Sequence, residues 1–127
     1  MKYLLDTHTI IWYLEASSEL PKKIEALIDD PKIDIIISSV SLWEIVIKSS
    51  LKKLTLNLSL EELLSGVKTR SFHILQIEDG HLLNLRKLPY IHKDPFDRLL
   101  VASAISEDMT LITADKNIRK YNVKCVW

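Results

Sequence analysis

The sequence has few of the residues that build redox sites, zinc sites or phosphate-binding loops. Among its 127 residues there are one cysteine, two glycines and four prolines. A single cysteine, Cys125, excludes an internal disulfide and a four-sulfur zinc site, and it suits a reducing compartment. With only Gly66 and Gly80, the chain has neither a phosphate-binding glycine loop nor a dinucleotide fingerprint. Cysteine-rich scaffolds and nucleotide-loop enzymes are therefore excluded.

Long apolar runs are missing as well. Asp6 interrupts the apolar start of the chain too early for a signal peptide, and no later run approaches the ~20 residues of a membrane span. The length and the content of 47% hydrophobic and 27% charged residues are typical of one soluble globular domain, residues 1–127. We therefore expect a cytoplasmic protein that does not contact a membrane.

An excess of positive charge is also absent, because 17 Lys and Arg balance 17 Asp and Glu. The distribution is uneven: residues 1–47 carry a net charge of −4 and residues 48–127 a net charge of +4. This asymmetry could place a basic rim beside an acidic pocket, as the cleavage of a polyanion with cations would require. Solvated helix surfaces would give the same count.

Short apolar runs alternate with helical patterns along the whole chain. Strands are expected at residues 2–6, 34–38, 72–77, 110–113 and 123–127, and helices at 7–14, 21–30, 41–53, 59–71, 78–88, 94–105 and 116–121. This alternation predicts an α/β fold, with a parallel sheet of about five strands and helices on both faces.

Four acidic residues fall where such a sheet would form a ligand site. Asp6 ends the first strand, Glu44 follows the second by one turn, and Asp115 lies just past the fourth. Asp97 opens the helix that leads into the fourth strand. Ligands bind beyond the carboxyl ends of parallel strands, and clustered carboxylates suit Mg²⁺ or Mn²⁺. Two such ions ~4 Å apart can hydrolyse a phosphodiester.

The same acids could instead be helix caps. Ser41 to Glu44 and Asp94 to Asp97 both fit capping boxes, and Asp6 or Thr7 and Asp115 could cap the helices that follow them. Ser59 to Glu62 has the same spacing and is assigned no chemistry. Position alone leaves both interpretations open.

Four segments occur together in order: LLDTH at 4–8, SLWEI at 41–45, HKDPFDRLL at 92–100 and LITAD at 111–115. Together they resemble the PIN-domain ribonucleases of the VapC toxin type, at the family's spacing and over nearly the whole chain. The resemblance implies a Mg²⁺ or Mn²⁺ site, endonucleolytic cleavage of RNA, a homodimer and inhibition by a cognate antitoxin. Hydrolysis by this metal mechanism would leave a 5′-phosphate and a 3′-hydroxyl.

Carried over residue by residue, the family's catalytic acids and metal ligands fall on Asp6, Glu44, Asp97 and Asp115. Thr7 and Thr113 match hydroxyl positions that would steady the site. Asp94 belongs to the signature but is expected to be an N-cap before a ligand.

Three basic residues lie close in sequence to these acids: Arg98, Lys48 and Lys116. They are candidate contacts for RNA phosphates. A solvated surface explains the lysines equally well, and Arg98 could instead hold a neighbouring carboxylate.

One segment departs from the family pattern. Relatives tend to have Leu-Gly-Lys-Leu after the third helix, where this chain has Leu51-Lys52-Lys53-Leu54. Without the glycine, the helix is expected to run further before it turns.

Several other functions remain in view. A receiver-type signalling domain also has this length, a parallel sheet and bound Mg²⁺, but it would have paired acids after the first strand. Histidine acid–base catalysis without metal is conceivable, yet surface or packing roles are expected for His8, His73, His81 and His92. Two alternatives remain. One is a non-catalytic binding module whose acids only cap helices, and the other is a PIN nuclease that processes RNA in a housekeeping role.

Overall fold

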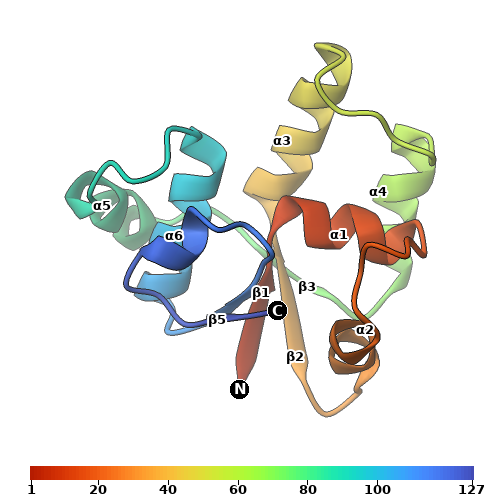
Figure 1. Ribbon diagram of the computed structural model, residues 1–127, viewed down its shortest axis with the longest axis horizontal. Coiled ribbons are helices and arrows are strands. Elements are labelled where there is room, and N and C mark those ends of the chain that lie inside the picture. Colours follow the sequence, from red (N-terminus) through yellow and green to blue (C-terminus); the bar gives the residue numbers. More distant parts are fainter.

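A five-stranded parallel sheet runs through the middle of the molecule (Figure 1). The computed structural model describes residues 1–127. The strands are β1 (Lys2–Leu5), β2 (Asp34–Ser38), β3 (His73–Leu75), β4 (Thr110–Ile112) and β5 (Cys125–Val126). Their order is β3-β2-β1-β4-β5, and every neighbouring pair is parallel. The chain segments that follow β1, β2 and β4 therefore begin side by side at one end of the sheet.

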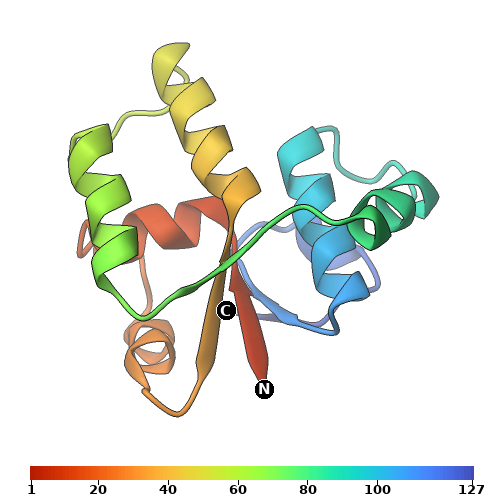
Figure 2. The ribbon, with the colours of Figure 1, turned by 180° about the vertical axis from the view of Figure 1, so that it is seen from behind.

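Six helices flank this sheet. They are α1 (Thr7–Leu14), α2 (Lys22–Asp29), α3 (Ser39–Ser50), α4 (Leu60–Thr69), α5 (Asp79–Lys87) and α6 (Pro95–Ser106), with a 3₁₀ turn η1 at Ile118–Lys120. Figures 1 and 2 show α1, α2 and α4 on one side of the sheet, α5 and α6 on the other, and α3 extending beyond the strand ends. None of the helices combines the length and apolarity needed to cross a lipid bilayer.

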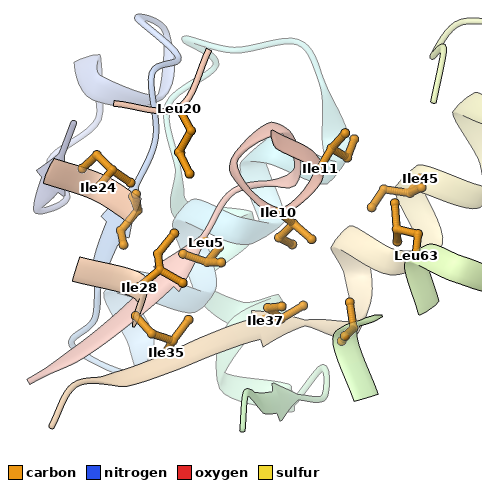
Figure 3. Packing of buried hydrophobic residues seen from close by; sticks show 12 residues of the cluster. Leu5, Ile10, Ile11, Leu20, Ile24, Ile28, Ile35, Ile37, Ile45 and Leu63 are labelled. Atoms are coloured by element: carbon orange, nitrogen blue, oxygen red, sulfur yellow. The ribbon is translucent and has the colours of Figure 1, made fainter. Parts of the chain in front are cut away.

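Each face of the sheet has its own hydrophobic core, because neighbouring residues of a strand point to opposite faces. Leu5 and Ile37 pack against residues of α1 to α4 in a cluster of 12 buried residues (Figure 3). Ile112 belongs to the same cluster. Leu4 and Ile36 turn the other way, into a second cluster of nine residues with α6. Burying one such side chain stabilises the fold by about 1.5–3 kcal/mol, so the two cores hold the strand ends firmly in place.

The predicted fold class and the alternation of elements are confirmed. The expected helix at 116–121 is only the 3₁₀ turn η1, and β3 and β5 are shorter than predicted. The strand order also differs from the 2-1-3-4-5 order of flavodoxin-like receiver domains. The topology therefore argues against the receiver alternative.

The prediction that α3 would run further is wrong, since the helix ends at Ser50. The N–H groups of Lys52 and Lys53 donate to the carbonyls of Ser49 (3.1 Å) and Lys48 (2.9 Å), which is the Schellman pattern of a helix end. Lys52 takes the left-handed conformation, with φ at 57°, that the family's glycine would adopt without strain. This sharp turn brings Leu54 back onto the first core. Tertiary packing therefore outweighs the preference of Lys52 for a negative φ.

Candidate metal-binding site

Asp6 lies between β1 and α1 and is only 5% exposed. Its Oδ1 accepts hydrogen bonds from the backbone N–H (2.8 Å) and the hydroxyl (2.7 Å) of Thr9, so it caps α1. Its Oδ2 accepts a short hydrogen bond from the hydroxyl of Thr113, which follows β4. Burial raises the pKa of Asp6, and the hydrogen bonds from Thr113 and Thr9 oppose that rise. One carboxylate thus links the beginning of the chain to its last part.

Glu44 lies inside α3 and is 2% exposed. Its Oε1 accepts a hydrogen bond from the Thr7 hydroxyl, and its Oε2 lies 2.6 Å from the Lys48 ammonium. The capping-box interpretation of Glu44 is wrong, because α3 begins at Ser39 and its cap is Ser38. The chain passes from β2 into the helix without a loop, which moves the helix start two residues ahead of Ser41. The buried Glu44 carboxylate is therefore free of any capping role.

Asp94 is the N-cap of α6. Its Oδ1 accepts from the N–H groups of Phe96 (2.8 Å) and Asp97 (3.3 Å), while its Oδ2 lies 2.7 Å from the Lys48 ammonium. Burial would raise the pKa of Asp94, but Lys48 and the backbone hydrogen bonds together lower it. Burial would lower the pKa of Lys48, yet Asp94 and Glu44 raise it well above its usual range. Lys48 is thus a fixed positive charge between two carboxylates.

Asp97 lies in the first turn of α6 and makes no cap hydrogen bond through its side chain. Its side chain is 15% exposed, and its Oδ2 lies 3.0 Å from Nε2 of His92. Burial, followed by the negative charges of the surrounding acids, raises the pKa of Asp97 to about 8. Its ionised form is therefore disfavoured in the metal-free protein, and a bound cation would stabilise that form.

Asp115 follows β4 and caps, through its side chain, the turn that leads into η1. Its Oδ1 accepts from the N–H groups of Asn117 (2.7 Å) and Ile118 (3.0 Å), and its Oδ2 lies 3.3 Å from Nε2 of His92. Burial would raise the pKa of Asp115, but the hydrogen bonds from Ile118 and His92 outweigh it and lower the pKa. One oxygen of Asp115 thus caps the turn, and the other is directed toward His92.

The donor set fits a hard divalent cation. Ligand atoms of Glu44, Asp94 and Asp97 lie within 4.8 Å of one another, and so do those of His92, Asp97 and Asp115. Asp97 belongs to both groups. Carboxylate oxygens dominate the set, which is the ligand chemistry that Mg²⁺ and Mn²⁺ prefer.

The two predicted hydroxyl positions contact the acids directly. Thr7 donates to Glu44, and Thr113 donates to Asp6. Lys116 is exposed at the position after Asp115.

Arg98 does not have the exposed guanidinium expected of a phosphate contact, since the residue is 5% exposed. Its guanidinium donates to the carbonyl of Pro89 (2.7 Å) and the hydroxyl of Tyr121 (3.1 Å), with longer contacts to the carbonyls of Leu88 and Leu85. Nor does it pair with a carboxylate. The structure therefore gives Arg98 a role in holding the segment between α5 and α6.

His92 is the site residue that sequence reasoning missed, because a surface or packing role was expected for every histidine. Of the others, His8 and His73 are exposed, and the buried His81 contacts Glu107 at 3.1 Å. Only one imidazole thus lies at the acidic cluster, so a pair of histidines for metal-free acid–base catalysis is absent. The place of His92 in the HKDPFDRLL segment was the available signal that it lies near the site, but this place does not show which ring nitrogen meets the Asp94 amide.

Comparison with protein families gives a match to the PIN domain over residues 3–124. Comparison with curated protein sequences gives no significant match. The fold is similar to VapBC2 from Rickettsia felis, solved bound to a DNA fragment from its promoter, with a TM-score of 0.74, 19% identity, and 100% and 99% of the two chains covered.

Two further structures have the same fold. A toxin–antitoxin complex from Klebsiella pneumoniae matches with a TM-score of 0.69 and 19% identity, covering 98% of this chain and 96% of the other. VapBC-1 from nontypeable Haemophilus influenzae also gives a TM-score of 0.69 and 19% identity, covering 99% and 97%. At these identities, the likenesses establish the fold.

Proposed function

Because the chain belongs to the PIN-domain family, we propose that it is a metal-dependent endoribonuclease of the VapC toxin type. The ligands of Mg²⁺ or Mn²⁺ in this proposal are Asp6, Glu44, Asp97 and Asp115. The observation that carries it is the convergence on Asp97 of acids from α3, from the start of α6 and from the segment after β4. Their charges, together with that of Asp6, help to raise the pKa of Asp97.

The capping alternative does not account for this arrangement. Asp6 and Asp115 each use one carboxylate oxygen to cap a helical turn and direct the other toward Thr113 or His92. Glu44 and Asp97 cap nothing with their side chains. Capping and metal binding are thus compatible roles for Asp6 and Asp115, whereas capping leaves Glu44 and Asp97 unexplained. Crowded carboxylates repel one another unless a cation offsets their charge.

The chain's own residues prepare the site for hydrolysis. A bound Mg²⁺ or Mn²⁺ ion would supply the positive charge that polarises the scissile phosphodiester and the attacking water. Thr7 and Thr113 orient Glu44 and Asp6, and Lys48 balances part of the negative charge. The expected products are a 5′-phosphate and a 3′-hydroxyl.

In the toxin role, the partners would be a small cognate antitoxin, a second copy of the chain in a homodimer, and RNA as substrate in the cytoplasm. The antitoxin is supported by the fold shared with the Klebsiella pneumoniae toxin–antitoxin complex. A short open reading frame directly upstream of this gene is the expected companion. If no such reading frame is found, a housekeeping role in RNA processing becomes the better hypothesis.

The decisive experiment compares Asp97→Asn and Asp6→Asn with the parent protein in cleavage of single-stranded RNA with Mg²⁺ or Mn²⁺. Loss of a ligand should lower the rate by about 100-fold or more, and EDTA should abolish cleavage by the parent. Asp34→Asn, at the exposed start of β2, is the matched control and should cleave at the parent rate. A folded Asp97→Asn variant with unchanged activity would refute the proposal.

A further inference from the structure

We infer that His92 is a positioning residue of this site, which donates a hydrogen bond from Nε2 to Asp115, lies in close polar contact with Asp97, and does not itself ligate the metal. The inference rests on the proposed function. By distance alone, the opposite role would be the natural one, because His92, Asp97 and Asp115 form a group with metal-ligand spacing. The hydrogen bonds around the imidazole decide between the two.

The second ring nitrogen of His92 determines where the proton lies. Nδ1 accepts a hydrogen bond from the backbone N–H of Asp94 at 3.1 Å. An amide N–H can only donate, so Nδ1 must offer its lone pair, and the neutral ring then carries its hydrogen on Nε2. An Nε2–H group has no lone pair to give to a metal ion.

Metal ligation through Nε2 would require the hydrogen to move to Nδ1. Two N–H donors, one from the ring and one from Asp94, would then face each other. Leaving a partly buried donor without an acceptor is unfavourable, and here two donors would be affected. The backbone of Asp94 is also fixed, because it forms the N-cap of α6. The amide therefore sets the tautomer of the ring.

The position of the ring is fixed from the other side as well. The backbone N–H of His92 donates to the hydroxyl of Tyr121 at 2.9 Å, and that oxygen also accepts from Arg98. His92 is thus held between the cap of α6 and the buried Tyr121. The buried Arg98 acts on the site through this contact.

With the ring so held, Nε2 lies 3.0 Å from Oδ2 of Asp97 and 3.3 Å from Oδ2 of Asp115. Asp115, from the segment after β4, accepts the hydrogen bond from Nε2, and Asp97, at the start of α6, lies against the same nitrogen. The imidazole therefore keeps the two carboxylates close to one point. Each carboxylate keeps lone pairs for a cation. Hydrogen-bonding partners of this kind orient metal ligands, and their loss typically costs 10–100-fold in metal affinity.

Two spectroscopic measurements on the parent protein test the assignment. In the metal-free protein, ¹⁵N NMR of the imidazole rings should show His92 protonated on Nε2 only, with its signals identified by their absence in His92→Gln. In the Mn²⁺-loaded protein, pulsed electron paramagnetic resonance should show no directly coordinated nitrogen. A coordinated nitrogen that disappears in His92→Gln would overturn the inference.

Metal affinity provides the third readout. His92→Ala should weaken Mn²⁺ binding roughly 10–100-fold, whereas His92→Gln, whose amide can donate from nearly the same place, should lose clearly less. His73→Ala, on the exposed face of β3, should match the parent. Unchanged affinity in a folded His92→Ala variant would overturn the positioning role while leaving the proposed nuclease intact. A parent protein that binds no Mn²⁺ would overturn both.

Discussion

At the scale of single residues, the carboxylates of the site differ in how readily they ionise. The pKa of Asp97 is raised to about 8, whereas those of Asp94 and Asp115 are lowered. At pH 7 the Asp97 carboxyl is therefore mostly protonated in the metal-free protein, and a metal ligand must be deprotonated. Binding of a cation should consequently expel a proton from this residue.

We predict that Mn²⁺ binding releases close to one proton at pH 7 and almost none at pH 9.5. Its affinity should rise up to about tenfold per pH unit as the pH approaches 8, and then level off. Isothermal titration calorimetry in two buffers of different ionisation enthalpy measures the release. Asp97→Asn should show neither effect; an equal release from this variant would mean that another group supplies the proton.

Arg98 provides a second test at this scale. Arg98→Lys cannot reproduce a planar guanidinium that reaches the Pro89 carbonyl and the Tyr121 hydroxyl together. We expect the free energy of unfolding to fall by about 2–4 kcal/mol, as measured by urea denaturation. Arg86→Lys, on the exposed side of α5, is the control and should be neutral. A stable Arg98→Lys variant with weakened RNA binding would restore the role predicted from sequence.

The acidic site residues could be predicted from the four sequence segments that resemble PIN domains and from the positions of the strand ends. Asp6, Glu44 and Asp115 come to one end of the sheet because parallel strands deliver their following residues there, and Asp97 is placed beside them by the start of α6. The role of His92 could not be predicted, since it depends on which of its nitrogens meets the Asp94 amide, and no spacing in the sequence encodes that contact. The burial of Arg98 could not be predicted either, because a charged residue next to a predicted ligand suggests a phosphate contact until its 5% exposure is known.

At the scale of helices, the chain ends three of them without glycine. Ala16, Lys52 and Asp108 have φ values of 51°, 57° and 51°, and each occupies the left-handed position of a Schellman motif. The left-handed conformation is less favourable for residues with a Cβ atom than for glycine.

We predict that Lys52→Gly raises the free energy of unfolding by about 1 kcal/mol. Lys52→Ala separates the backbone effect from the loss of charge and should change stability much less. Thermal denaturation of both variants at matched pH decides the point. A destabilised glycine variant would mean that the Lys52 side chain contributes contacts that outweigh the strain.

Helix boundaries show where sequence reasoning stops. Apolar periodicity located every strand and all six helices, but the start of α3 was placed at Ser41 because Ser41 and Glu44 have capping-box spacing. The true cap is Ser38, whose hydroxyl accepts from the N–H of Val40 at 3.1 Å. Two serines three residues apart offer equivalent local signals, and only the register of β2 in the sheet selects between them.

At the scale of the whole molecule, the site bridges elements that pack on different cores. The Lys48 ammonium links Glu44 of α3 to Asp94 at the start of α6, and nearby the rings of Trp43 and Phe96 lie 5.1 Å apart. Ile45 of α3 belongs to one core and Leu100 of α6 to the other. The ion pair is therefore a connection between the two halves.

We predict that Lys48→Met destabilises the metal-free protein by about 1–3 kcal/mol, because the buried Glu44 carboxylate loses its charged partner. Mn²⁺ should then raise the melting temperature of this variant more than that of the parent, since the cation replaces the missing charge. Differential scanning fluorimetry with and without Mn²⁺ compares them. An equal metal-induced shift in the two proteins would contradict this account, and Lys53→Met is the exposed control.

The hydrogen bond from Thr113 to Asp6 joins residues 107 positions apart, and β4 is the immediate neighbour of β1. A growing chain that has not yet reached β4 lacks both Thr113 and Asp115, so it cannot complete the candidate site. On the proposed function, such a chain is harmless to the messenger and the machinery that produce it. Cutting ability then arises only after β4 has been made, which gives a co-expressed inhibitor the time needed to synthesise the preceding residues.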